Sequence, residues 1–313
     1  MATAQKAAAP LRRAAGPATG PRPGRRRASL VPVLLVLPYT VLLLAFGLGP
    51  AVYALWLSFT DATGGFAGVD NYARVVQDFR FPGAARHVAL FVGLWLVLLV
   101  VLVVVLALLV HAVSRRWVGT ALRFAYYVPG ALAGASSVLL WLFLLNPVAS
   151  PAAPLLRLLG YESFNDTIQP TNLPVVFALI AFWTGAGGWI LVMFGALNNI
   201  PDDVMEAARI DGAGPVRIAW SIQLPLIRKW VTYMVILSLA AGTQLFVEPT
   251  LLSQASNAVV PNDYSLNQLA YQYAFSLADF NGSAAISVLL LVVSLGLSSV
   301  FVARGGLFDT DAS

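Results

Sequence analysis

The sequence predicts an all-α membrane protein with six transmembrane helices and with both termini on the cytoplasmic side. Three observations lead to this prediction: an apolar composition, six long apolar stretches, and a one-sided distribution of basic residues. Of the 313 residues, 59% are apolar and 11% are charged, which leaves too few polar side chains to cover the surface of soluble domains of this size. The chain contains no cysteine, which excludes disulfide bonds and thiolate metal sites.

Each apolar stretch is about 20 residues long or longer, which is the length that a helix needs to cross a hydrocarbon core of about 30 Å. The expected spans cover residues 30–57, 88–110, 124–145, 173–197, 230–252 and 284–302. The first span carries Pro32, Pro38 and Pro50, so we expect it to begin at the membrane interface or to kink inside the membrane. Together the spans form one membrane domain over residues 30–304.

The basic residues fix the expected orientation. If the N-terminus is cytoplasmic, all 19 Lys and Arg residues lie on the cytoplasmic side except Arg74, Arg80, Arg86 and Arg157. Cytoplasmic loops are enriched in Lys and Arg, so this orientation is favoured, and an even number of spans returns the C-terminus to the same side. In a membrane protein the positions of the basic residues matter more than the formal net charge of +5, so we expect no nucleic-acid partner.

The two ends of the chain are expected to be tails. Residues 1–29 are mostly Ala, Pro, Gly and Arg, a composition too poor in apolar surface to offset the entropy of ordering, and we interpret them as a disordered basic cytoplasmic tail. The Arg25-Arg26-Arg27 run is also compatible with the start of a secretory signal, but the apolar stretch that follows is longer than a signal core, which favours a retained first span. Residues 305–313 form a short cytoplasmic tail.

The loop between the fourth and fifth spans, residues 198–229, predicts two short helices. Pro201 suits the first helical position, and Asp202 and Asp203 follow in the first turn, where the helix dipole favours negative charge. The first helix is expected to end at residues 212–214, because glycine adopts the left-handed conformation that terminates helices. The second short helix then begins at Pro215 and is bounded by Pro225.

The first of these helices carries a face of small side chains that ends in a carboxylate. Its members follow the i, i+3, i+4, i+7 spacing: Val204, Ala207, Ala208 and Asp211. Small side chains let another surface approach the backbone closely. Glu206 projects from a different face and is able to pair with Arg209 or with a basic group of a partner.

These residues resemble a known family motif. The run Glu206-Ala207-Ala208, three residues, Gly212, nine residues, Ile222, one residue, Leu224-Pro225 matches the EAA loop of prokaryotic ABC-importer permeases, which also favours the Asp211-Gly212-Ala213 found here. In that family the loop is the coupling helix that docks into a groove on the ATP-hydrolysing subunit. The resemblance therefore implies an ABC type I importer permease fold and a coupling role for Glu206–Pro225. Lys229 departs from the family pattern, which often has proline there.

The alternative interpretation of this loop is an amphipathic helix that rests on the bilayer surface. Such helices favour bulky apolar and basic residues, whereas this one carries alanine and acids, so the coupling interpretation is preferred.

Weaker similarities point to the carbohydrate branch, of the maltose and glycerol-phosphate type. They are Gly68-Val69-Asp70-Asn71-Tyr72, Tyr126-Tyr127-Val128-Pro129 and Ser283-Ala284-Ala285-Ile286-Ser287. The resemblance implies a multi-pass subunit of the prokaryotic cytoplasmic membrane that imports a sugar or related carbohydrate. It also implies a second permease subunit in a heterodimer, two ATPase subunits that bind ATP and Mg, and an extracytoplasmic solute-binding protein. A homodimer and a non-sugar solute are the open alternatives.

Candidate residues for the substrate path are polar or aromatic side chains within the spans, since a sugar path needs hydrogen-bonding groups and aromatic faces. They are Trp183, Thr184, Trp189, Gln244 and Glu248. Glu248 is the one acid expected inside a span, near its outer end, and an intramembrane acid is a functional hypothesis by default. Interfacial placement of Glu248 and simple packing of the two tryptophans are the competing interpretations.

Other classes of function fit less well. A membrane prenyltransferase needs paired acidic motifs for magnesium, and Asp202-Asp203 has no second motif at a suitable spacing. No phosphate-binding glycine loop is present, so we expect no catalytic residues and no cofactor in this chain. His87 and His111 flank opposite ends of one span and are too far apart to share a metal. A secondary transporter would show inverted repeats and buried ionisable residues, and it would leave the EAA loop unexplained.

Overall fold

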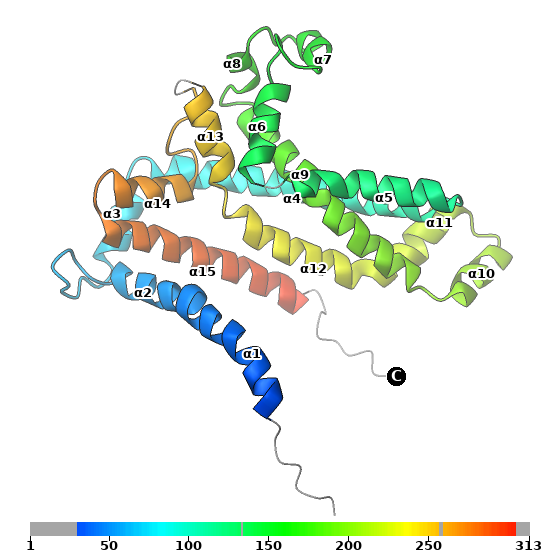
Figure 1. Cartoon of the computed structure of the whole chain (residues 1–313), viewed down its shortest axis with the longest axis horizontal. Helices are drawn as coiled ribbons and strands as arrows, with labels where there is room; N and C mark the ends of the chain where they lie inside the picture. The colour runs from blue at the N-terminus through cyan, green and yellow to red at the C-terminus, as the bar shows by residue number, and fades with distance from the viewer. Residues whose placement is uncertain (1–29, 133, 257–258, 305–313) are drawn as a thin grey trace, which may run out of the picture. The chain divides into compact units, whose positions relative to one another are not determined.

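The computed structural model describes residues 30–132, 134–256 and 259–304 of the chain. The chain forms two units, Met1–Ala51 and Val52–Ser313. All regular elements of the described residues are helices (Figure 1). The two expected tails, residues 1–29 and 305–313, lie outside the described residues.

The first unit contains α1 (Leu30–Leu42), a π-helical turn (Leu43–Leu48) and the start of α2 (Gly49–Ser58). The second unit contains α3 (Asp70–Gln77), α4 (Phe81–His111), α5 (Arg116–Ala131), α6 (Ala135–Leu144), α7 (Ala153–Leu158), α8 (Phe164–Thr167), α9 (Leu173–Asn198), α10 (Asp202–Ile210), α11 (Pro215–Ile218), a second π turn (Ala219–Gln223), α12 (Leu224–Gly242), α13 (Val247–Ala255), α14 (Leu266–Phe275) and α15 (Phe280–Arg304).

Five helices of the described residues are long and apolar enough to cross a membrane. They are Leu34–Ser58, Phe81–His111, Leu173–Asn198, Pro215–Gly242 and Phe280–Arg304. The bent pair of α5 and α6 makes a sixth if it counts as one span. The expected first, second, fourth and sixth spans are therefore confirmed, with ends shifted by a few residues.

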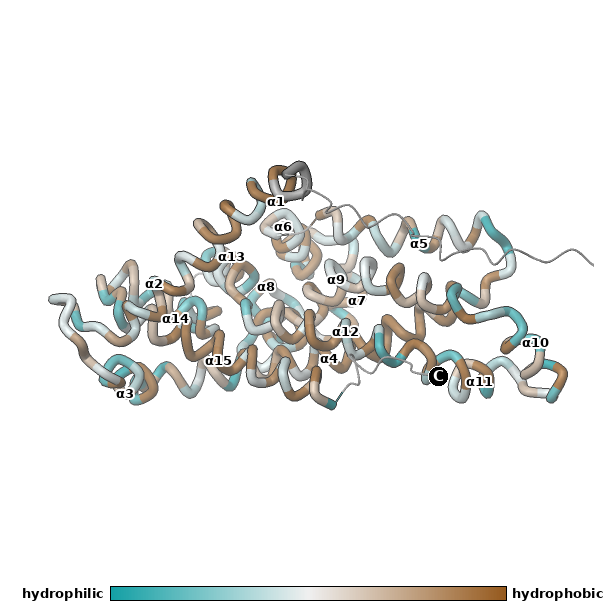
Figure 2. The backbone as a smooth tube through the Cα atoms, turned by 90° about the horizontal axis from the view of Figure 1, so that it is seen from below, coloured by the Kyte–Doolittle hydropathy of each residue, from teal (hydrophilic) through white to brown (hydrophobic). Residues whose placement is uncertain are grey.

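The core of the second unit lies among α4, α9 and α12. Leu99, Met193 and Met234, one from each of these helices, are completely shielded from solvent. Figure 1 shows α12 running beside α15, and α12 also packs against α4. Figure 2 shows hydrophobic residues along α4 and α12, whereas hydrophilic residues gather at α3 and around α10.

The third span differs from the expected helix over 124–145. It begins earlier, at Arg116, and divides into α5 and α6, which are bent by 103°. Pro129 lies in the last turn of α5, and Gly134 precedes α6 with a φ of 75° that favours glycine. These two residues give the local reason for the break.

The fifth span also differs from its expected bounds. The helix runs from Pro215 to Gly242 without interruption, so the prediction that Pro225 bounds a short second helix is wrong. A proline inside a helix clashes with the carbonyl group four residues earlier, which here belongs to Ser221. That residue lies in the π turn Ala219–Gln223, whose wider winding moves the carbonyl away. A π turn likewise precedes Pro50.

Glycine permits a close approach between α5 and α9. A Cβ atom added at Gly187 would overlap the backbone carbonyl group of Tyr126 and lie 2.9 Å from the Cα atom of Tyr127. At Gly130 it would lie 3.1 Å from the carbonyl oxygen of Thr184. Small residues at such crossings let helix backbones pack directly in a membrane.

We therefore expect Gly187→Ala to destabilise the folded protein by about 1–3 kcal/mol, because the added methyl group forces the two backbones apart. The measurement is the apparent melting temperature of the purified protein in detergent. Gly188→Ala is the matched control, since a Cβ atom there meets nothing within 4 Å. Equal melting temperatures for the two variants would contradict the proposed close approach.

Two buried asparagines close the end of α2. The Asn71 side-chain amide donates hydrogen bonds to the carbonyl oxygens of Ser58 (2.9 Å) and Thr60 (2.8 Å). The amide of Asn281 donates to the carbonyl oxygens of Leu57 (3.0 Å) and Thr60 (2.7 Å). These carbonyl groups lie at or beyond the end of α2, where the helix supplies no further N–H donor. The Leu57 carbonyl also accepts from the N–H and the hydroxyl group of Thr60. The motif that contains Asn71 thus ties the end of α2 to α3, and Asn281 ties it to α15.

Replacing Asn281 with alanine leaves buried carbonyl groups with fewer donors. We expect a loss of about 1–3 kcal/mol of stability, the usual cost of an unsatisfied buried polar group, measured as a lower apparent melting temperature. Ser287→Ala on the same helix is the control, because its hydroxyl group is exposed and bonds only within the helix. Equal melting temperatures for the two variants would show that the Asn281 amide does not stabilise the end of α2.

Candidate functional site

The predicted coupling loop consists of α10, a tight elbow and α11. The backbone N–H of Ala213 donates to the carbonyl oxygen of Ala208, and the N–H of Gly212 donates to that of Arg209, each at 3.0 Å. This pair of bonds is the Schellman motif, which requires a left-handed residue after the helix. Gly212 supplies it with a φ of 77°, so the expected glycine elbow is confirmed.

The start of α10 differs slightly from its expected form. Pro201 precedes the helix with an extended ψ of 137° and is the N-cap residue, so the prediction that it occupies the first helical position is wrong by one residue. The first two helical positions belong to Asp202 and Asp203, as expected for the positive end of the helix dipole.

The small-residue face of α10 is divided between the protein and the solvent. Ala208 is buried at 7% exposure, whereas Ala207 and Asp211 are exposed. Glu206 is also exposed, and among the described residues no ion pair joins it to Arg209. The side chains of Glu206 and Ala207 are therefore accessible from outside this chain.

Large apolar side chains extend this surface. Ile210, Val216 and Trp220 are 86%, 80% and 74% exposed. They flank the Gly212 elbow in sequence. These three residues were not predicted, because only the small residues of the loop were considered. The available signal was the presence of large apolar residues in a short loop between two spans. Exposed apolar groups of this size are typical of interaction surfaces.

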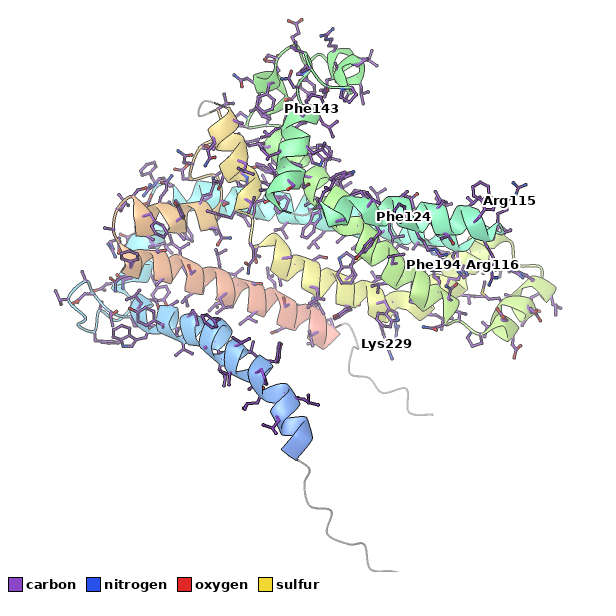
Figure 3. The ribbon with its side chains drawn as sticks, viewed as in Figure 1. Arg115, Arg116, Phe124, Phe143, Phe194 and Lys229 are labelled. Carbon is purple, nitrogen blue, oxygen red and sulfur yellow. The ribbon has the colours of Figure 1, made fainter. Side chains whose placement is uncertain are left out.

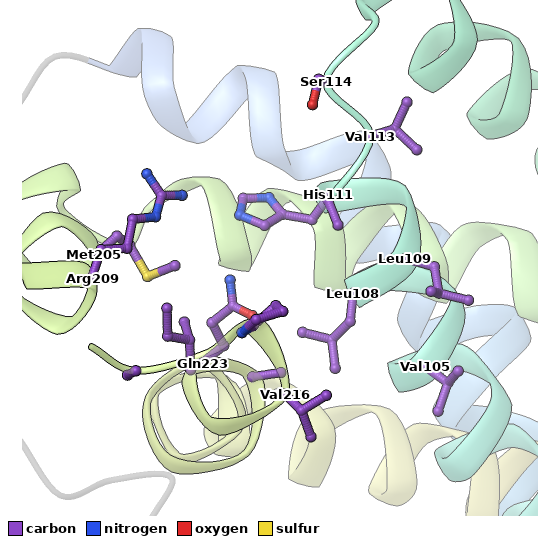
Figure 4. A pocket seen from close by; sticks show the side chains of 15 residues that line it. Val105, Leu108, Leu109, His111, Val113, Ser114, Met205, Arg209, Val216 and Gln223 are labelled. Atoms are coloured by element: carbon purple, nitrogen blue, oxygen red, sulfur yellow. The ribbon is translucent and has the colours of Figure 1, made fainter. Parts of the chain in front are cut away.

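A cavity of about 620 Å³ lies beneath the loop. Figure 4 shows His111 at the end of α4, Met205 and Arg209 from α10, and Gln223 from the π turn around it. Leu224 follows directly and continues into α12. The cavity separates the loop from the end of α4. Three residues join the loop to α9, whereas its other end continues without interruption into α12.

Three of the five substrate-path candidates meet in a second cavity of about 210 Å³. Thr184 of α9, Gln244 after α12 and Glu248 of α13 line it. Phe91 and Trp95 of α4 line the same cavity, with their rings stacked at 5.8 Å. The cavity thus combines an amide, a hydroxyl, a carboxyl and two aromatic rings.

Phe91 and Trp95 were not predicted. Their span is apolar on all sides, so its sequence gives no preferred face. The available signal was the aromatic pair at i and i+4, which places both rings on one side of a helix.

The break after α12 creates this cavity. A Cβ atom at Gly242 would lie 2.8 Å from the Trp95 ring, so glycine is needed for their contact. The helix ends there, and the Asn267 amide donates to the carbonyl oxygen of Thr243 (3.1 Å). Glu248 then begins a separate helix, so its expected position inside the fifth span is wrong.

Glu248 is the charged group of the cavity. Burial raises the pKa of its carboxyl group, because a poorly solvated site disfavours the charged form. Among the described residues no Lys or Arg lines this cavity to offset the negative charge. The described lining therefore contains an acidic group and no cation that could bind an anion.

The two remaining candidates lie elsewhere. Trp183 meets Trp141 of α6 edge to face at 6.1 Å, and Trp189 meets Tyr233 of α12 at 5.9 Å. Both are helix-to-helix contacts, and neither residue lines the cavity.

The described residues contain no group of three or more His, Asp or Glu side chains arranged for a metal ion. His87 stacks on Tyr264 at 4.3 Å, and His111 contacts Phe194 edge to face at 6.1 Å. The two histidines lie near opposite ends of α4.

Comparison with known proteins gives a consistent result. The family described as binding-protein-dependent transport system inner membrane component matches residues 100–305. The sn-glycerol-3-phosphate transport system permease protein UgpA of Yersinia pestis bv. Antiqua (strain Antiqua) is 30% identical over 279 residues, which cover 87% of this chain and 92% of that protein. UgpA of Escherichia coli O6:K15:H31 (strain 536 / UPEC) is 28% identical over 88% of this chain and 93% of that protein.

Solved structures share the fold. A chain of a bacterial alginate ABC transporter, in complex with an alginate pentasaccharide-bound periplasmic protein, aligns with a TM-score of 0.75 and 20% identity over 87% of this chain and 92% of that chain. A chain of a bacterial ABC transporter involved in the import of the acidic polysaccharide alginate aligns with a TM-score of 0.73 and 19% identity over 88% of this chain and 94% of that chain.

Proposed function

The chain belongs to the family of binding-protein-dependent transport system inner membrane components, and we propose that it forms half of the translocation pathway of an ATP-driven importer. The observation that carries this proposal is the uninterrupted helix Pro215–Gly242. It joins the coupling loop at one end to the polar cavity at the other. With 28 residues, the helix spans about 42 Å.

The coupling loop serves as the docking surface for an ATPase subunit. Its exposed acid and small residue, Glu206 and Ala207, lie on α10, with the exposed apolar side chains of Ile210 and Trp220 nearby in sequence. An apolar centre surrounded by polar groups is the usual composition of a protein interface. The Gly212 elbow fixes the angle between α10 and the helix that follows.

The partners follow from this role. We propose a second permease subunit of different sequence, two ATPase subunits that bind ATP and Mg, and an extracytoplasmic solute-binding protein in a prokaryotic cytoplasmic membrane. This chain supplies no catalytic group of its own. Its loop end, with Arg209 and Arg217, faces the cytoplasm in this arrangement, in agreement with the enrichment of basic residues on that side.

Gly212→Val tests the coupling role. A β-branched residue at a φ of 77° is strained, at a cost of about 1–2 kcal/mol or more, so we expect uptake and co-purification of the ATPase subunits to fall by about tenfold. Gly214→Val is the matched control, since Gly214 has an ordinary φ of −70° and open space around it.

Normal uptake and normal ATPase coupling in Gly212→Val would contradict the docking role. Uptake that continues after ATP is withdrawn would instead favour a secondary transporter, the alternative class.

For the cargo, we propose an uncharged carbohydrate or polyol. The stacked Phe91 and Trp95 rings suit the apolar face of a sugar, and Thr184 and Gln244 offer hydrogen-bonding groups. The named relatives and neighbours handle sn-glycerol 3-phosphate and alginate, which are anionic. The Glu248 carboxyl group, without a lining Lys or Arg, favours a neutral cargo here.

Glu248→Gln tests the charge selection. Removal of a like charge a few ångströms away is worth about 1 kcal/mol or more, so we expect anionic sugars to gain about tenfold in uptake relative to their neutral counterparts. The measurement is competition by neutral sugars and sugar phosphates in proteoliposomes that contain the assembled transporter and its binding protein. An unchanged ratio would remove Glu248 from the cargo path while leaving the importer assignment intact.

A further inference from the structure

A third cavity, of about 540 Å³, lies where the end of α4, the start of α5 and the end of α9 meet. Its polar and aromatic lining consists of His111, Arg116, Thr120, Arg123, Phe194 and Asn198. No Asp or Glu is among the described residues that line it. The cavity is therefore cationic. It shares residues, among them His111, with the cavity beneath the coupling loop but no described residue with the cargo cavity.

The guanidinium group of Arg123 is held in a fixed orientation. It lies 4.4 Å from the centre of the Phe194 ring. Its Nε donates to the carbonyl oxygen of Gly119 (3.0 Å), and a terminal nitrogen donates to the hydroxyl oxygen of Thr120 (3.1 Å). An arginine has five N–H donors, so further donors remain available to an anion.

Arg116 adds a second cation about two helical turns before Arg123 on the same side of α5. It is exposed, and among the described residues no carboxylate forms an ion pair with either Arg116 or Arg123. Figure 3 shows Arg115 and Arg116 together at the start of α5. Two arginines without acidic partners beside one cavity favour an anionic ligand with several acceptor oxygens, such as a phosphate group.

The surface next to this cavity is apolar. Trp117 and Phe124 are 71% and 70% exposed, and their spacing of seven residues places them on the same side of α5. Exposed aromatic residues beside basic residues at the end of a span are typical of the membrane interface. An apolar face that adjoins a cationic cavity fits a phosphate that carries acyl chains better than a soluble one.

We propose that this cavity binds the phosphodiester headgroup of an anionic phospholipid, with Arg116 and Arg123 on the phosphate and the acyl chains along the Trp117 and Phe124 side of α5. Basic pockets between transmembrane helices on the cytoplasmic side are suited to such headgroups. The proposal depends on the chain being a membrane protein but not on the nature of its cargo.

Native mass spectrometry of the complete transporter in detergent tests the site. Phosphatidylglycerol and phosphatidylcholine with identical acyl chains are the probes, and the apparent affinity of each is measured. We expect phosphatidylglycerol to bind more tightly to the wild-type protein. Arg116→Gln should weaken that binding about fivefold, and the double variant Arg116→Gln/Arg123→Gln more than tenfold.

Arg304→Gln is the matched control, because Arg304 is an exposed basic residue at the end of α15, outside the cavity. It should bind phosphatidylglycerol as the wild-type protein does. Arg116 is exposed, and within the part of the chain that the structure describes its side chain forms no ion pair, so the single variant separates binding from folding. Inorganic phosphate serves as the acyl-free competitor and should not displace the lipid at millimolar concentration.

Equal affinity for the two lipids, or equal binding by Arg116→Gln and Arg304→Gln, would overturn the proposal. Displacement of the lipid by inorganic phosphate would assign the cavity to a soluble anion instead. Lipid binding is measured independently of transport, so a loss of transport in Gly212→Val does not change its result. Failure of the importer role and failure of the lipid site are therefore distinguishable.

Discussion

The pairing of backbone polar groups is the constraint on which the rest of this structure depends. In a bilayer core no water is available to an unpaired N–H or C=O group, so each interruption of a helix needs another partner. At the end of α2 the partners are the side-chain amides of Asn71 and Asn281. After α12 the partner is the amide of Asn267, and after α10 it is the backbone of the Gly212 elbow. Two of these interruptions, after α10 and after α12, lie at the proposed coupling loop and at the proposed cargo cavity.

The same constraint explains which features could be predicted from the sequence. Span length follows from apolar stretches, and the Gly212 elbow follows from the preference of glycine for a positive φ. The sequence did not predict which side chains of a span point inward, because a span that is apolar on all sides has no preferred face. Thr184 and Gln244, which were named for their polar side chains, line one cavity, whereas Trp95 of the same cavity was not predicted. Contacts such as that of Trp183 with Trp141 depend on helix crossings that only the folded chain defines.

Charge distinguishes the cavity proposed for the cargo from the cavity proposed for the lipid headgroup. The cargo cavity holds one carboxyl group, that of Glu248, and the cavity at the start of α5 holds Arg116 and Arg123. Among the described residues no opposite charge lines either cavity, and an uncompensated charge costs solvation energy unless a ligand or solvent compensates. An anionic headgroup would offset the two arginines, whereas a neutral cargo leaves the raised pKa of Glu248 in place. Opposite ligand preferences at the two sites follow from this separation.

The helix that joins the coupling loop to the cargo cavity is intact because of its π turn. Had Pro225 ended the second short helix, as its chemistry suggests, the loop and α12 would be separate bodies joined by a flexible break. The wider turn at Ala219–Gln223 removes the clash instead, and the helix continues to Gly242, which packs on Trp95. A displacement of the elbow therefore moves a helix whose far end lines the cavity. The helix therefore connects the loop to the proposed cargo site over about 42 Å.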